Sequence, residues 1–236
     1  MTTSQQALVR AAARDNAAWC AVMCRVHGVE SSFGEDAWAA ARRTPVYYPD
    51  AVTLRPGADP GALVGRIDTA SPGASVKDSF ADLDLTGAGF RVLFEAEWIH
   101  REPGVPAPPP EFAWEVVSDR VALRDWALAW DDGGGNADLF GPGLLDDPQT
   151  SVLAGRSADG RVAGGAVARR SDHVVGVSNL FGPPHAIWPL VLHAVGLRFP
   201  GLPVVGYEQG DDLAAALRHG FGAVGPLRVW VHEPSA

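Results

Sequence analysis

The segment that decides the fold runs from Asp172 to His232 and reads DHVVGVSNLFGPPHAIWPLVLHAVGLRFPGLPVVGYEQGDDLAAALRHGFGAVGPLRVWVH. Apolar runs with strand character alternate in it with runs of helical periodicity. The pattern predicts strands over 174–181, 203–208 and 227–232, with helices over 187–199 and 211–219 between them. Asp211 or Asp212 is expected to cap the second helix, and Gly220 to end it. This order is typical of a domain with a partly parallel sheet.

The residues before this segment extend the same domain. A short strand is expected over 112–117, and a helix over 121–130 with Asp119 as its N-cap. Two further strands, over 150–153 and 161–168, are joined by a turn. A strand meander followed by strand–helix–strand–helix–strand predicts an α+β fold, with a mixed, largely antiparallel sheet and helices on both faces.

The first half of the chain has helical periodicity at its start and strand character at its end. Helices are predicted over 18–26, 34–43 and 62–67, and strands over 46–54, 75–85 and 90–99. We interpret this half as a smaller, degenerate copy of the same architecture. The sequence PGVPAPPP, Pro103 to Pro110, excludes helix and sheet interior. It therefore suggests two domains, 1–105 and 111–236.

Charge and composition exclude several functional classes. The net charge of −9 and the absence of a basic stripe argue against nucleic-acid or anionic-membrane binding. No apolar run reaches the roughly 20 residues of a membrane span, and the N-terminus lacks the apolar core of a signal peptide. A cytoplasmic location is therefore expected. Cys20 and Cys24 are expected to be buried structural residues. Lys77 is the only lysine, a skew that is typical of a GC-rich genome and predicts nothing about function.

Residues 112–232 resemble the GCN5-related N-acetyltransferase (GNAT) superfamily in the order of their elements and in one motif. That motif is Asn-x-x-Ala, then a tyrosine, then Gly-Phe, and here it reads Asp211-Asp212-Leu213-Ala214-Ala215-Ala216-Leu217-Arg218-His219-Gly220-Phe221. The resemblance implies transfer of an acyl group, most commonly acetyl, from acyl-CoA to an amine. In this superfamily two parallel strands separate, and the pantetheine arm of coenzyme A inserts between them.

Two positions depart from the family pattern. Ala216 stands where the family often has a tyrosine that reprotonates the coenzyme A thiolate, and Tyr207 and His219 are the nearest alternatives in sequence. The family's glycine-rich pyrophosphate loop is replaced by Phe181-Gly182-Pro183-Pro184-His185-Ala186. The two prolines remove two backbone N–H donors from this loop.

The resemblance nevertheless implies a site at the ends of the strands over 174–181 and 203–208. Glu208 would act as general base toward the amine, and Tyr207 as the acid toward the thiolate. The expected contacts with acetyl-CoA, a substrate here, come from Ser178, Asn179, Leu180, Phe181, Gly182, His185 and Asp211. The acceptor would be a small amine. A homodimer is left open, and no histidine spacing indicates a metal site. The alternative is a non-catalytic ligand- or partner-binding relative that has lost this chemistry.

Overall fold

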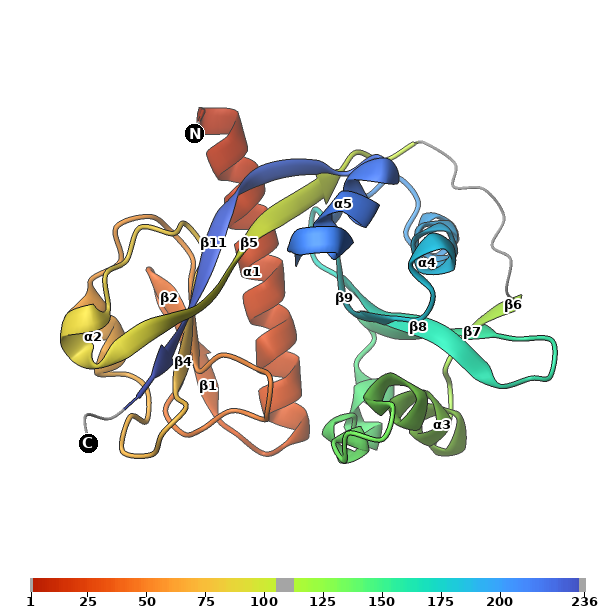
Figure 1. Cartoon of the computed structure of the whole chain (residues 1–236), viewed down its shortest axis with the longest axis horizontal. Coiled ribbons are helices and arrows are strands. Elements are labelled where there is room, and N and C mark those ends of the chain that lie inside the picture. The colour runs from red at the N-terminus through yellow and green to blue at the C-terminus, as the bar shows by residue number, and fades with distance from the viewer. Residues whose placement is uncertain (1, 105–112, 234–236) are drawn as a thin grey trace. The chain divides into compact units, whose positions relative to one another are not determined.

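The computed structural model describes residues 2–104 and 113–233 (Figure 1). Its contacts divide the chain into two units. Unit 1 comprises Met1–Trp98, Tyr207–Gln209 and Ala223–Ala236, and unit 2 comprises Ile99–Gly206 and Gly210–Gly222. The units thus follow contacts and not chain order, since most of the last strand belongs with the N-terminal residues. The Pro103–Pro110 segment lies mostly outside the described residues.

Unit 1 is a sheet with a long helix on one face. Its helices are α1 (Thr3–Val26), α2 (Pro60–Val64) and a 3-10 turn, η1 (Thr86–Ala88). Its strands are β1 (Ser31–Phe33), β2 (Ala37–Ala40), β3 (Ala51–Thr53), β4 (Ser75–Asp78), β5 (Phe90–Arg101) and β11 (Gly222–His232), in the order β1-β2-β3-β4-β11-β5. Strands β3 and β4 are parallel, and β4 and β11 are antiparallel.

Helix α1 starts at a capping box and packs through small residues. Thr2 accepts from the backbone of Gln5 while the Gln5 side chain accepts from the backbone of Thr2. The buried face of α1 carries several alanines, and this face lies against β1 and β3. Side chains alternate between the two faces of the strands. Val76 accordingly joins the apolar cluster that contains α2 residues, and Lys77 lies on the opposite face.

Three predictions for the first half were wrong in part. The helix expected over 34–43 is strand β2, because its Ala-Trp-Ala-Ala sequence is buried between sheet neighbours, a context that outweighs helix propensity. The strand over 46–54 is confined to β3, since Pro45 and Pro49 flank a turn in which Tyr47 has a φ of +72°. The strand over 75–85 ends at Asp78, whose carboxylate accepts from the N–H groups of Phe80 and Leu83.

Unit 2 has helices on both faces of an antiparallel sheet that ends in one parallel pair. Its strands are β6 (Ala113–Val116), β7 (Thr150–Arg156), β8 (Val162–Arg170), β9 (Val175–Phe181) and β10 (Val204–Glu208), in the order β10-β9-β8-β7-β6. Its helices are α3 (Arg120–Asp131), α4 (Pro184–Arg198) and α5 (Gly210–Arg218), with 3-10 turns η2 (Ala137–Leu139) and η3 (Pro142–Asp146). Figure 1 shows α3 and α4 on opposite sides of β8. The predicted α+β class and mixed sheet are confirmed.

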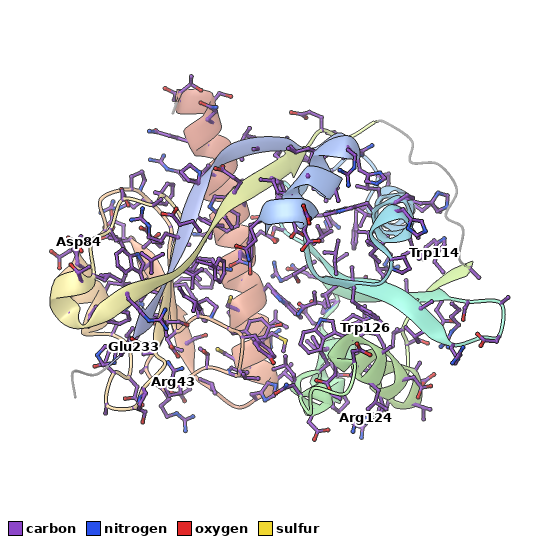
Figure 2. All side chains as sticks on the ribbon, in the orientation of Figure 1. Arg43, Asp84, Trp114, Arg124, Trp126 and Glu233 are labelled. Carbon is purple, nitrogen blue, oxygen red and sulfur yellow. The ribbon has the colours of Figure 1, made fainter. Side chains whose placement is uncertain are left out.

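Trp126 anchors α3 to the sheet. Its indole N–H donates to Leu153 O at 2.9 Å, and its ring meets Phe140 and Phe181 edge-on at 4.9 and 5.2 Å. Figure 2 shows Trp126 on the side of α3 that faces the sheet and Arg124 on the outer side, where Arg124 pairs with Asp138. The amphipathic helix predicted over 121–130 is therefore confirmed, as is its Asp119 cap.

Two smaller expectations about the fold have different outcomes. Helix α5 begins at Gly210, so Asp211 and Asp212 lie in its first turn and do not precede it as a cap. Cys20 and Cys24 are buried free thiols, as predicted. In the described part of the chain, no helix combines the length and the apolar character needed to cross a membrane.

Candidate functional site

The parallel pairing of β9 with β10 is short. It joins Val204 to Val175 and Val205 to Gly176, whereas β9 continues through Val177 to Phe181. Gly206 still approaches β9 closely, because a Cβ added there would lie 3.2 Å from Val177 O. Within unit 2, five residues of β9 therefore extend beyond its register with β10.

A β-bulge lies in this extended part of β9. On its other side β9 pairs with β8, where Val167 opposes Ser178 and Gly165 opposes Phe181. One residue of β8 thus faces two of β9, Asn179 and Leu180. Asn179 has a φ of +54°, in the left-handed region. Bulges bend a strand and redirect its backbone groups, and they are frequent next to active sites.

Two of the residues expected to contact acetyl-CoA contribute core side chains. Phe181 packs edge-on against Trp126 on the α3 side, and Leu180 packs against the apolar cluster that contains α4. Both side chains are half-buried and partly committed to these contacts. Ser178 and Asn179 are half-buried, and neither belongs to this cluster.

The loop after β9 is tightly packed and poor in donors. A Cβ on Gly182, whose φ is +115°, would lie 2.7 Å from Gly164 Cα. Pro183 and Pro184 have no N–H, and the N–H groups of Ala186 and Ile187 both donate to Pro183 O at 2.9 and 3.0 Å. Helix α4 thus offers fewer N-terminal amides to an anion than an ordinary helix does. His185 is exposed in this first turn.

The C-terminal motif is placed on α5. Asp211 is exposed at the start of this helix, and Ala216 is fully buried in the unit 2 core. Ala216 therefore brings no hydroxyl to a site. His219 follows the helix, where its carbonyl accepts from Arg101 Nε at 3.0 Å. Burial, with the nearby charges of Arg218 and Arg101, lowers the pKa of the His219 imidazole.

Strand β10 carries Tyr207 and Glu208 into unit 1. Both side chains are half-buried. The Tyr207 ring meets Trp98 edge-on at 5.7 Å, and the ammonium of Lys77 lies 3.9 Å from its centre. The sequence-predicted residues therefore divide, with Tyr207 and Glu208 in unit 1 and Ser178, Asn179, Leu180, Phe181, Gly182, His185 and Asp211 in unit 2.

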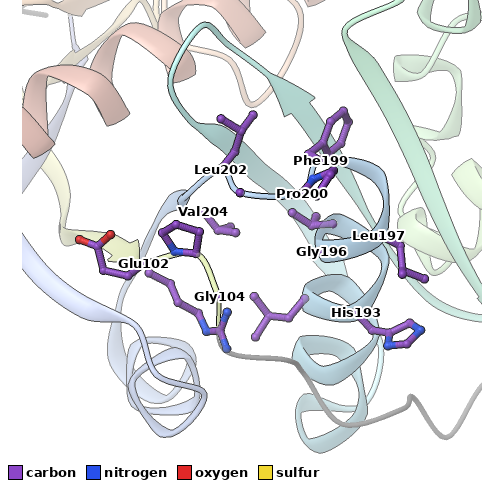
Figure 3. A pocket seen from close by; sticks show the side chains of 14 residues that line it. Glu102, Gly104, His193, Gly196, Leu197, Phe199, Pro200, Leu202 and Val204 are labelled. Carbon is purple, nitrogen blue, oxygen red and sulfur yellow. The ribbon is translucent and has the colours of Figure 1, made fainter.

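Tyr207 lines a cavity of about 430 Å³ in unit 1, together with Lys77, which the sequence did not single out as a site residue. Lys77 lies in β4, and its sequence context alone carried no functional signal. A second cavity, of about 380 Å³, lies in unit 2 beside the C-terminal half of α4 (Figure 3). It is mostly apolar, and none of the sequence-predicted site residues lines it. Among the described residues, no group of three or more potential metal ligands is found.

Known structures share this fold at low sequence identity. No family model and no curated protein matches the chain. A GCN5-related N-acetyltransferase from Kribbella flavida superposes with a TM-score of 0.64 at 18% identity, covering 95% of this chain and 96% of that one. A GNAT-family acetyltransferase structure from Novosphingobium aromaticivorans gives 0.58 at 16% identity, covering 94% and 99%.

A third structure, of Saccharomyces cerevisiae N-myristoyltransferase with bound myristoyl-CoA, gives a TM-score of 0.50 at 10% identity and covers 71% of this chain and 52% of that one. The first two matches cover more than nine tenths of this chain, so the likeness extends over both units. The chain therefore has the fold of the GCN5-related N-acetyltransferases.

Proposed function

We propose that this protein is an acyl-CoA-dependent N-acyltransferase that acts on a small amine. The observation that carries the proposal is the extension of β9 beyond its two-residue register with β10, with a bulge at Asn179 and Leu180. A bulged strand beyond its parallel register offers backbone groups to an extended ligand such as a pantetheine arm. The shared fold with acetyltransferase structures supports the same reaction class.

In the proposed reaction the amine nitrogen attacks the thioester carbonyl, so that a C–N bond forms and the C–S bond breaks. Glu208 accepts the proton that the nitrogen loses. Tyr207 donates its phenolic proton to the departing thiolate and later regains one from solvent. The products are an N-acylated amine and free coenzyme A.

The primary test is a calorimetric titration of the full chain with acetyl-CoA, repeated with butyryl-CoA and myristoyl-CoA. Product formation from a panel of small amines is followed by mass spectrometry. We expect binding of at least one acyl-CoA and an N-acylated product. The absence of heat with all three at high micromolar concentrations would refute the proposal.

Two variants test the assigned roles. Glu208→Gln and Tyr207→Phe are expected to reduce kcat by about 10²- to 10⁴-fold, the usual range for removal of a general base or acid, with the Kd for acyl-CoA unchanged. Glu95→Gln is the matched control, because Glu95 is an exposed β5 carboxylate paired with Arg228. Wild-type turnover in either test variant would remove that residue from the mechanism.

A second candidate function is a non-catalytic ligand- or partner-binding protein. It is favoured by the buried Ala216 at the family's tyrosine position and by the two prolines that remove donors at the start of α4. Acyl-CoA binding without turnover on any amine, unchanged in Tyr207→Phe, would support this candidate over the enzyme.

A further inference from the structure

We infer that the unit 1 cavity is the acceptor site and that it takes an amine bearing a carboxylate and an apolar side chain, such as a hydrophobic α-amino acid. That the bound amine is the acyl acceptor rests on the proposed acyltransferase function. The carboxylate recognition itself rests on the cavity, and it can be tested without any transfer.

The charge of the cavity is the first argument. The chain carries a net charge of −9, yet the side chains that line this cavity include two cations, Arg43 and Lys77, and no carboxylate. Arg43 is committed to the fold, since it pairs with the buried Asp50 and donates to Gly73 O. Asp50 also accepts from the N–H groups of Thr44 and Ser75. Lys77 is therefore the cation left to recognise an anion.

The position of Lys77 is the second argument. Its side chain is 4% exposed, and its ammonium donates to Asn16 Oδ1 at 2.9 Å while it lies over the Tyr207 ring. An ammonium has three N–H donors. The two groups in contact with the Lys77 ammonium, the neutral Asn16 amide oxygen and the Tyr207 ring face, do not fully compensate its positive charge. Buried charges are stabilised by an opposite charge, which a carboxylate ligand in the cavity would supply.

The rim of the cavity is apolar. Val46, Tyr47 and Leu93 line it and are 52%, 68% and 50% exposed, respectively, and apolar side chains gathered around one cavity are typical of a binding site. Phe94 and Val231 continue this apolar lining. A ligand that fits has a charged end directed to Lys77 and an apolar end toward the rim, and the volume of about 430 Å³ accommodates an amino acid with a large side chain.

The cavity also explains why the acceptor would be a carboxylate-bearing amine and not a polycation. Tyr207, the proposed acid, lines the same cavity, so an acceptor held by Lys77 would lie beside a group of the reaction. A nearby ammonium disfavours a second positive charge, and this favours the neutral, nucleophilic form of the bound amine.

The test compares L-phenylalanine with L-phenylalaninamide, which differs by the loss of the carboxylate charge. Calorimetric titration of the full chain in the absence of acyl-CoA is expected to show at least tenfold tighter binding of phenylalanine. In Lys77→Met, which keeps an unbranched side chain of similar length without the charge, this preference should disappear. Arg91→Met is the matched control, because Arg91 is an exposed cation of unit 1 paired with Glu233, and it should retain the preference.

The outcomes separate this inference from the proposed function. Equal binding of phenylalanine and phenylalaninamide to the wild type would overturn the inference. This comparison does not depend on whether the Lys77→Met variant folds. N-acylation of amines that lack a carboxylate, with no phenylalanine binding, would overturn it while supporting the acyltransferase. Phenylalanine binding that depends on Lys77, with no acyl-CoA binding, would support the cavity's ligand class and refute the transfer reaction.

Discussion

At the scale of single residues, Gly165 has no room for a side chain. A Cβ there would lie 2.5 Å from Leu153 O and 2.8 Å from Phe181 Cε1, and it would also collide with the Trp126 indole. We expect Gly165→Ala to lower the free energy of unfolding by more than about 2 kcal/mol, because neither the backbone oxygen nor the packed rings can move away cheaply. Urea denaturation measures this change through its midpoint.

The control for this prediction is Gly196→Ala. Gly196 lies within α4, and a Cβ added to it has no heavy atom within 4 Å. Alanine should therefore leave stability unchanged or raise it by up to about 1 kcal/mol through helix propensity. Equal midpoints for the two variants would show that the close packing around Gly165 of β8 does not contribute to the free energy of unfolding.

At the residue scale, sequence patterns indicate whether a residue is buried or exposed, but they do not predict which residues it contacts. The Gly164-Gly165 pair has no phosphate-loop context in the sequence. In the structure Gly164 is required by the close approach of Phe181 O, and Gly165 by the Trp126 indole and Leu153 O. Glu95 is exposed on β5 and pairs with Arg228, a residue distant in sequence. The buried position of Lys77 could not be read from the sequence, because its neighbours Asn16 and Tyr207 are distant along the chain.

At the scale of elements, the N-cap of α3 offers a direct measurement of local stability. The carboxylate of Asp119 accepts from the N–H groups of Val121 and Ala122, both at 2.9 Å. Asp119→Ala should lower the free energy of unfolding by about 1 kcal/mol, because it leaves these donors without a protein acceptor. Asp119→Asn retains an acceptor oxygen and should recover most of the loss. Equal loss in both variants would assign the effect to charge and not to the cap.

Elements with strong periodicity could be predicted from the sequence, whereas short buried ones could not. Helices α3 and α4 and strands β9 and β10 were predicted with small errors at their ends. The β2 strand was predicted as a helix, since four buried residues of alanine and tryptophan carry no alternation of apolar and polar side chains. The bulge at Asn179 also left no sequence signal, because it depends on the register with β8.

At the scale of the whole molecule, the last strand, β11, belongs to unit 1 through contacts that the order of the elements in the sequence does not reveal. Residues 223–233 belong to unit 1, where Val229 and Val231 of β11 pair with Lys77 and Ser75 of β4. A pairing across about 150 residues is set by the core and not by local propensity. The unit 1 cavity is therefore completed by residues from both ends of the chain and from β10.

The dependence of global stability on alkaline pH is a further property of the whole molecule. Burial raises the pKa of the Cys20 thiol from 9.0 to about 12, and burial also raises that of Cys24 to about 11. A thiol that ionises more readily in the unfolded chain contributes stability below pH 9 that is lost as the pH rises toward 12. For Cys20 alone the loss at pH 10.5 is about 2 kcal/mol. Urea denaturation from pH 8 to pH 10.5 should therefore show a decline in stability that is shallower in Cys20→Ala by about this amount. Parallel declines in the two proteins would show that the Cys20 thiol ionises in the folded state as readily as in the unfolded one.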